Sequence, residues 1–145
     1  MAHHLSNEKI VVVNSISAKQ EKDLLSLFKN EWWSRDRTEH DIKVILKNSS
    51  LIFGLVDETN NNLIGFTRVL TDFFKFVYIY DVIVHIDYRK MRLGKTLIDT
   101  VLEHSAIKNI SSIELVCKKE MMPFYKQFGF SENYDESIAM RKRKN

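Results

Sequence analysis

An apolar run at residues 76–84 constrains the fold more than any other part of this sequence. The run, FVYIYDVIV, is rich in aromatic and β-branched residues and is apolar on both alternating faces apart from Asp81. This pattern is typical of a central strand with both faces covered. Residues 97–102 then carry apolar side chains on one helical stripe. A strand that leads through a short loop into a helix predicts an α/β fold built on a sheet that contains this strand.

Further apolar runs are predicted to be strands because each is bounded by polar turn residues. They cover residues 9–13, 51–56, 63–70, 112–116 and 138–140. Two helices should begin at capping boxes, in which Ser17 is followed by Gln20 and Thr38 by Asp41.

A last short helix should open at Pro123 and close at Gly129. The sequence shows no internal repeat, no low-complexity tract and no linker. We therefore expect a single mixed-sheet domain over residues 1–145, of which residues 1–7 form a disordered leader.

Composition and charge exclude several classes of protein. No apolar stretch approaches the roughly 20 residues that span a bilayer, and the single cysteine, Cys117, has no internal disulfide partner. We therefore expect a cytoplasmic protein with no membrane partner. Much of the net charge of +3 lies in residues 141–144, which we interpret as a solvated tail, so nucleic acid is not the expected partner. His3 and His4 have no further ligands nearby, and no metal site is expected.

Cationic residues gather where the central strand gives way to the helix. Arg89, Lys90, Arg92 and Lys95 precede or open this helix. A helix N-terminus presents backbone N–H groups that have no acceptor within the helix, together with a partial positive charge. The segment therefore suits a bound phosphate, although a solvated basic turn would have the same composition.

The triplet Gly94-Lys95-Thr96 also invites comparison with a Walker A loop. That motif requires a glycine five positions before its second glycine, where this sequence has Arg89. No later strand ends in a convincing metal-binding aspartate. The Walker A interpretation is therefore disfavoured.

The segment YRKMRLGKTLI, residues 88–98, resembles the acetyl-CoA loop of the GNAT superfamily of N-acetyltransferases. The family pattern is Arg or Gln, two variable residues, Gly, one variable residue, and Gly or Ala. Arg92 stands where the family has its first glycine. A second segment, PFYKQFGF at residues 123–130, resembles the family's later tyrosine-containing helix that ends in Gly-Phe. With the order of strands and helices, the resemblance covers essentially the whole chain.

The resemblance implies a fold, a cosubstrate and a set of residues that bind it. The fold would be α/β and GNAT-like, with a central, mixed but mostly antiparallel twisted sheet of about six to seven strands flanked by about four helices. Acetyl-CoA would lay its pantetheine arm along the end of the central strand and its pyrophosphate on the loop, without a metal. The residues implied to bind it are Val82, Ile83, Val84, Arg89, Lys90, Met91, Arg92, Leu93, Gly94, Lys95 and Thr96.

The implied reaction is direct attack of a neutral amine on the thioester carbonyl, whose oxygen is polarised by backbone N–H near Ile83. Tyr125 matches the family tyrosine that protonates the departing thiolate, although its position beside Phe124 and Phe128 also suits simple packing. Asp81 would relay the amine proton or, equally, fix a neighbouring loop by accepting backbone N–H bonds. Burial should raise its pKa unless a cation compensates.

Trp33, Arg68 and Asp72 lie where family members form the acceptor pocket, and each also suits a structural role. The resemblance leaves the acceptor open, so both small-molecule and protein amines remain candidates. If the φ of Arg92 is negative, this residue still donates its N–H and adds a cation, and we expect acetyl-CoA binding to survive.

Two rival functions remain. One is a degenerate family member that binds CoA or a protein partner without transferring anything, and the other is a nucleic-acid-binding module. The exposed edge of a small mixed sheet also allows a homodimer.

Overall fold

The computed structural model describes residues 9–132 and 135–144. Contacts divide the chain into two compact units, one ending at Leu115 and the other beginning at Val116. The single domain over residues 1–145 stays a prediction. The leader expected at residues 1–7 lies outside the described residues.

The first unit contains one sheet whose strands follow sequence order. The strands are β1 (Ile10–Val13), β2 (Leu51–Asp57), β3 (Asn62–Thr71), β4 (Phe76–Val84) and β5 (Ser112–Leu115). Strands β1 to β4 pair antiparallel, whereas β4 and β5 pair parallel. The mixed, mostly antiparallel sheet is thus confirmed.

The predicted number of strands, about six to seven, is wrong. The sheet has five strands among the described residues, and residues 138–140 form none. Ile138 is 80% exposed and Met140 is 89% exposed. A short apolar triplet becomes a strand only when a neighbouring strand satisfies its backbone groups, and this one has no such neighbour among the described residues.

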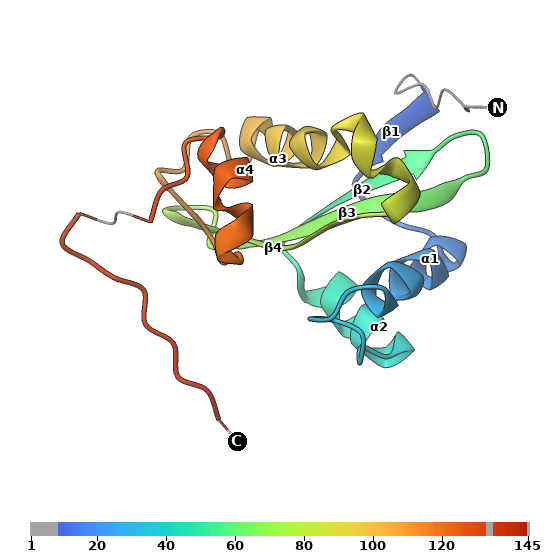
Figure 1. The fold of residues 1–145 in the computed structure, drawn as a ribbon, viewed down its shortest axis with the longest axis horizontal. Coiled ribbons are helices and arrows are strands. Elements are labelled where there is room, and N and C mark those ends of the chain that lie inside the picture. The colour runs from blue at the N-terminus through green and yellow to red at the C-terminus, as the bar shows by residue number, and fades with distance from the viewer. Residues whose placement is uncertain (1–8, 133–134, 145) are drawn as a thin grey trace. The chain divides into compact units, whose positions relative to one another are not determined.

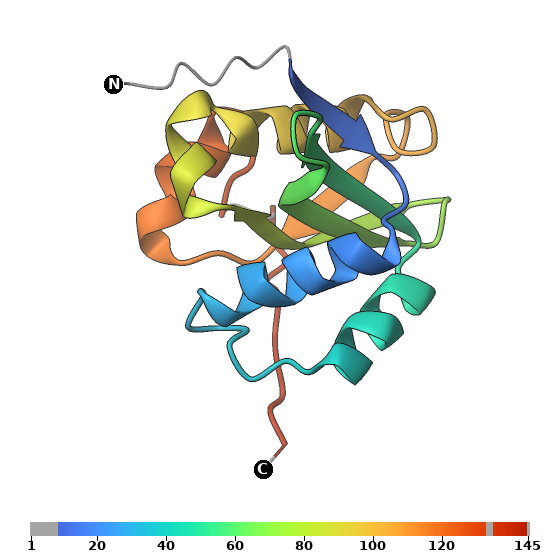
Figure 2. The ribbon, with the colours of Figure 1, turned by 90° about the vertical axis from the view of Figure 1, so that its right-hand side faces the viewer.

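Three α-helices cover the sheet of the first unit: α1 (Ala18–Lys29), α2 (Glu39–Asn48) and α3 (Leu93–Glu103). Helix α3 lies on one face, and α1 and α2 lie on the other (Figures 1 and 2). Both predicted capping boxes form. Ser17 Oγ accepts the N–H of Gln20 at 3.2 Å, and Gln20 Oε1 accepts the N–H of Ser17 at 3.0 Å. These bonds satisfy donors that the helix itself leaves without acceptors.

The core of the first unit joins α1 and α2 to the sheet. Its buried apolar side chains are Leu24, Leu27, Phe28, Ile42, Val56, Leu63, Phe66 and Ile83. Full burial of one such side chain stabilises the fold by about 1.5–3 kcal/mol. Because Ile83 belongs to this cluster, the end of β4 is fixed to the core.

Strand β4 is not covered on both faces, contrary to the prediction. Val77 and Ile79 are buried, whereas Phe76, Tyr78 and Tyr80 on the other face are 36–39% exposed. These three rings stack along the strand with neighbouring centroids 6.5 Å apart. Aromatic residues appear as core in a sequence pattern, yet a tyrosine keeps its hydroxyl accessible on a half-open face.

The second unit contains a 3-10 helix, η3 (Lys119–Met121), and the short helix α4 (Met122–Lys126), which has Pro123 in its first turn as predicted. The helix ends before Gly129. Gly129 has a φ of 92° and donates its N–H to the Lys126 carbonyl at 3.0 Å, so it closes the turn that follows the helix.

No helix in residues 9–132 or 135–144 is both long enough and apolar enough to cross a membrane.

Candidate functional site

A β-bulge interrupts the ladder between β3 and β4. Between the pairs Phe66–Ile83 and Arg68–Tyr80, β4 has two residues where β3 has only Thr67. The Thr67 hydroxyl donates to the Tyr80 carbonyl at 2.8 Å, so the bulge has its own internal bond. A bulge bends its strand and redirects the backbone that follows.

On the other edge of β4, the strand pairing ends next to the bulge. Strand β5 pairs with β4 over Phe76–Ile79 and stops there. Residues 80–84 therefore have no strand partner on that side within the described part of the first unit. Unpaired strand N–H and C=O groups suit an extended ligand. The backbone of Val82, Ile83 and Val84 fits the predicted pantetheine site, although the side chain of Ile83 belongs to the core.

The predicted basic loop contains a 3-10 helix, η2 (Ile86–Met91). The Tyr88 hydroxyl donates to Asp57 Oδ2 at 2.7 Å, and burial raises the pKa of Tyr88. Hydrogen bonds from Thr59 and Tyr88 hold the pKa of Asp57 below its ordinary value. The segment that ends at Met91 is thus pinned to β2 before α3 begins.

Arg92 joins η2 to α3 with a left-handed backbone, at φ 58° and ψ 30°. The expectation that acetyl-CoA binding survives assumed a negative φ at Arg92, and the φ is positive. The Thr96 N–H donates to the Arg92 carbonyl at 3.2 Å, whereas the N–H groups of Leu93 and Gly94 open the first turn, where no intrahelical acceptor exists. The side chain of Leu93 is buried, so only its backbone can contact a ligand.

The cations of this segment have different surroundings. Arg89 forms an ion pair with Glu31, and Lys95 pairs with an aspartate one helical turn later. Lys90 and Arg92 have exposed side chains. Lys90 and Arg92 are therefore the best placed of the four for a bound anion, while Arg89 also ties the segment to the end of α1.

Asp81 lies in the bulge, and its side chain is only 6% exposed. It pairs with two arginines: Arg37 donates from both terminal nitrogens at 2.8 and 3.0 Å, and Arg68 donates from Nε at 2.7 Å. The guanidinium of Arg37 lies 4.4 Å from the Phe28 ring centroid and 5.5 Å from that of Trp33. Two predicted residues, Trp33 and Asp81, thus contact Arg37, and the third, Arg68, joins them through Asp81. No sequence pattern indicated Arg37.

Asp72 lies apart from this cluster, in the turn between β3 and β4. Its Oδ1 accepts the N–H groups of Phe74, Lys75 and Phe76 at 2.9, 2.9 and 3.0 Å. These bonds lower the pKa of Asp72. The carboxylate therefore shapes the turn, and no hydrogen bond or ion pair among the described residues joins it to Asp81.

Tyr125 belongs to the second unit and is 8% exposed. Its ring makes edge-to-face contacts with Phe124 and Phe130, at centroid distances of 4.9 and 6.1 Å. Burial raises the pKa of Tyr125 to about 12, and the thiol of Cys117 adds to the shift. The phenol therefore keeps its proton at neutral pH.

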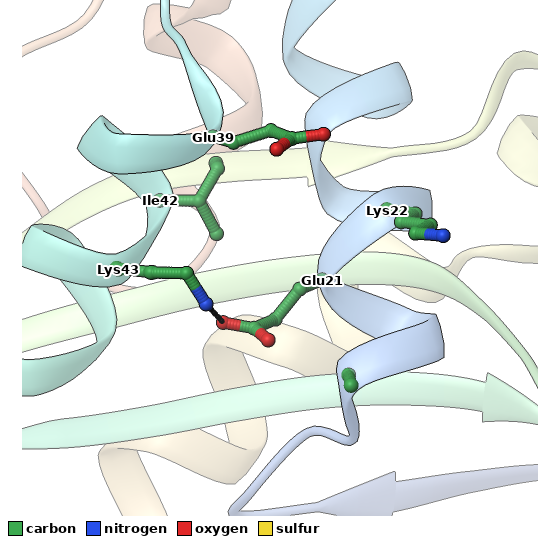
Figure 3. A pocket seen from close by; sticks show the side chains of 6 residues that line it. Glu21, Lys22, Glu39, Ile42 and Lys43 are labelled. Carbon is green, nitrogen blue, oxygen red and sulfur yellow. Dashed lines mark ion pairs between the residues drawn. The ribbon is translucent and has the colours of Figure 1, made fainter.

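A shallow pocket of about 170 Å³ lies between α1 and α2 (Figure 3). Ile42 lies on its wall, and Lys43 faces Glu21 across it at 3.8 Å. The pocket shares no residue with the predicted site. No group of three or more His, Cys, Asp or Glu side chains in the described ranges could hold a metal ion.

Comparison with known proteins places this arrangement in a family. A sequence model of the Acetyltransferase (GNAT) family matches residues 18–130. An uncharacterized N-acetyltransferase, ycf52, of Pyropia yezoensis is 34% identical over 96 residues, covering 65% of this chain and 55% of that protein. The ycf52 protein of Gracilaria tenuistipitata var. liui is 31% identical over 115 residues, covering 78% of this chain and 63% of that protein. The chain thus spans only part of the length of these relatives.

Solved structures share the fold at lower identity. A putative acetyltransferase from Deinococcus radiodurans superposes with a TM-score of 0.79 at 22% identity, covering 99% of this chain and 93% of that one. A putative GNAT-family acetyltransferase from Xanthomonas campestris gives a TM-score of 0.78 at 22% identity, covering 92% of this chain and 93% of that one.

Proposed function

Because the chain belongs to the GNAT family of acetyltransferases, we propose that it transfers the acetyl group of acetyl-CoA to a primary amine of a small molecule or protein. The observation that carries the proposal is the backbone geometry at the end of β4. There a bulge and an unpaired strand edge lead into η2 and the N-terminus of α3. This combination offers extended backbone for an amide-rich arm and a positive helix end for phosphates.

Acetyl-CoA is the cosubstrate in this proposal. Its pantetheine arm would bond to the backbone of residues 82–84. Its pyrophosphate would lie on the N–H groups that open α3, with Lys90 and Arg92 supplying charge. Arg89, Met91 and Thr96 would shape this loop, since Arg89 is already paired with Glu31 and the Thr96 hydroxyl donates to the Arg92 carbonyl at 3.3 Å.

The chemistry is addition followed by elimination. The amine nitrogen forms a bond to the thioester carbon, the carbonyl π pair moves to oxygen, and a backbone N–H near Ile83 stabilises that negative charge. The oxyanion then re-forms the carbonyl and expels the CoA thiolate. The nitrogen gives up one proton to solvent, and the thiolate takes one, so the products are an amide and free CoA thiol.

Tyr125 is the proposed donor of the proton to the thiolate. Burial raises the pKa of Tyr125 to about 12, so the phenol carries a proton at neutral pH. After it gives this proton to the thiolate, the phenolate takes one back from solvent. Its packing against Phe124 and Phe130 holds the ring in one orientation within the second unit, as a fixed proton donor requires.

The test is thiol release from acetyl-CoA across a panel of amines, with Cys117→Ser as the background because this removes the protein's one thiol. Tyr125→Phe should lower kcat by about 10²–10⁴-fold and leave the Kd for acetyl-CoA within about twofold of the background value. Equal turnover in the two proteins would remove Tyr125 from the mechanism. No acetyl-CoA binding by the background protein would defeat the proposal itself.

A protein that binds CoA without transferring the acetyl group is the second candidate. The left-handed Arg92 favours it, since a side chain stands where the family has glycine beside the pyrophosphate. The same assay separates the two candidates, because this protein would bind acetyl-CoA and release no thiol with any amine.

The proposed function leaves the location of the protein and its assembly as separate questions. Two relatives from Arabidopsis thaliana are named as chloroplastic GCN5-related N-acetyltransferases, whereas a cytoplasmic location and a homodimer stay predictions for this chain.

A further inference from the structure

We propose that Asp81 is a positioning residue that holds the acceptor side and the cofactor side of the site in one arrangement, through an ion triad of Asp81, Arg37 and Arg68. This inference rests on the proposed function. It assigns Asp81 a role other than proton relay, and it adds Arg37, which no sequence pattern indicated.

The backbone conformation of Asp81 indicates that the surrounding contacts hold this residue in place. Its φ is 58°, a left-handed conformation that aspartate and asparagine tolerate better than most residues. It lies in the bulge where β4 has one residue more than β3. Strained backbone persists only where its surroundings determine it, and here the nearby Thr67–Tyr80 hydrogen bond and the two arginines do so.

Both oxygens of the Asp81 carboxylate accept hydrogen bonds from these arginines, which occupy three of its roughly four acceptor positions. Oδ1 accepts from Arg37 at 3.0 Å, and Oδ2 accepts from Arg37 at 2.8 Å and from Arg68 at 2.7 Å. A general base needs an oxygen that can approach the amine, whereas both oxygens of this buried carboxylate already face the two guanidinium groups.

Arg37 connects this carboxylate to the segment between α1 and α2. Its guanidinium lies 4.4 Å from the Phe28 ring, in the core, and 5.5 Å from the Trp33 ring. Phe28 and Trp33 also contact each other edge to face at 6.2 Å. The α1–α2 connection is therefore tied to β4 by one bidentate pair, and the two ring contacts hold Arg37 against α1 and against Trp33 of the same connection.

The two ends of this link lie on different parts of the proposed site. Trp33 belongs to the proposed acceptor wall, whereas residues 82–84, which follow Asp81 directly, offer the backbone proposed for the thioester and the pantetheine arm. A displacement of Asp81 would move both. Misplacing reacting groups by about 1 Å costs about 10²-fold in rate, so the triad sets the distance between amine and thioester without touching either.

The test compares Asp81→Asn with Asp36→Asn. Asparagine keeps the shape of Asp81 and its tolerance of a left-handed backbone but loses the charge, and Asp36 is an exposed aspartate next to Arg37. We expect Asp81→Asn to lower kcat about 10²-fold, raise the KM of the amine, keep both limbs of the pH–rate profile, and speed amide exchange at residues 80–84. Asp36→Asn should behave as wild type.

Arg37→Gln should reproduce the effects of Asp81→Asn, and the double variant should be no worse than either single one, because both remove the same link. If Asp81→Asn does not fold, Arg37→Gln alone carries the test, since its side chain is 24% exposed. Loss of one limb of the pH–rate profile in Asp81→Asn would overturn the inference in favour of a general base. Wild-type exchange at residues 80–84 in both variants would overturn it as well.

The controls distinguish this failure from failure of the proposed function. Wild-type protein that binds no acetyl-CoA by calorimetry contradicts the proposed function. The amide-exchange comparison needs no substrate and still reports on the triad in that case.

Discussion

Replacing Arg92 with glycine tests the most unusual backbone of the candidate site. Arg92 has φ 58° and ψ 30° at the junction of η2 and α3. A left-handed conformation costs a residue with a Cβ atom about 1–2 kcal/mol. Glycine avoids this cost, but it lowers the free energy of unfolding by about 0.4–1 kcal/mol because it makes the unfolded chain more flexible. The difference predicts that Arg92→Gly stabilises the protein by about 0.8 kcal/mol, the midpoint of a range from about 0 to about 1.6 kcal/mol.

Thermal unfolding measures this gain. For a chain of this size, 1 kcal/mol corresponds to about 2–4 °C in Tm. Arg92→Ala is the matched control because it removes the same cation but keeps the Cβ atom, and an exposed substitution of that kind changes stability by no more than about 0.5 kcal/mol. The glycine variant should therefore melt above both wild type and Arg92→Ala. Equal Tm values for the glycine and alanine variants would refute the reasoning.

The same pair of variants separates charge from backbone in acetyl-CoA binding. Removing the cation weakens the attraction for phosphate in both variants, and this loss shrinks in 1 M salt, where the Debye length falls to about 3 Å. Only glycine lets the ligand approach the backbone more closely. At high salt, Arg92→Gly should bind acetyl-CoA more tightly than wild type, and Arg92→Ala should not. Isothermal titration at low and high salt distinguishes these outcomes.

Other predictions follow from single contacts. The pKa of Tyr125 is raised to about 12, above the ordinary value of about 10. Its contribution to stability is therefore complete below pH 10 and is lost as the pH rises from 10 towards 12. The free energies of unfolding of wild type and Tyr125→Phe, measured by chemical denaturation, should converge over that range, and a constant difference would contradict the prediction. Asp72 has a lowered pKa because its carboxylate accepts backbone N–H bonds, so Asp72→Ala should lower Tm at pH 7, and the deficit should disappear as the pH falls through that lowered pKa. Ser17→Ala should cost about 1 kcal/mol in urea denaturation because it removes the cap of α1, whereas Ser111→Ala, at an exposed position outside helices and strands, should have little effect.

Features set by neighbours in the sequence were predicted well. The capping boxes at Ser17 and Thr38 form as expected because both partners lie within one helical turn. The change of hydrophobic period after β4 correctly placed α3. The loop motif at residues 88–98 identified the family, since its spacing reflects the backbone geometry of one strand-to-helix connection.

Features set by distant contacts were not predictable in this way. Arg37 and Asp81 are 44 positions apart, and no local spacing relates them. The positive φ of Arg92 was missed because an arginine in a sequence gives no sign of a left-handed backbone, although the family glycine at this position hinted at one. The role of Asp72 in the acceptor pocket stays a prediction, and its carboxylate accepts three N–H groups of its own turn. The exposed face of β4 was missed because hydrophobicity does not reveal which strand faces lack a covering helix.

The row of Phe76, Tyr78 and Tyr80 gives this protein a built-in optical probe. Stacked rings in a fixed chiral array couple their electronic transitions, and the centroids here repeat every 6.5 Å on a face open to solvent. Near-ultraviolet circular dichroism should therefore carry a signal from this strand without any label. A molecule that settles on these rings would change their spacing or surroundings, so its binding can be followed by titration.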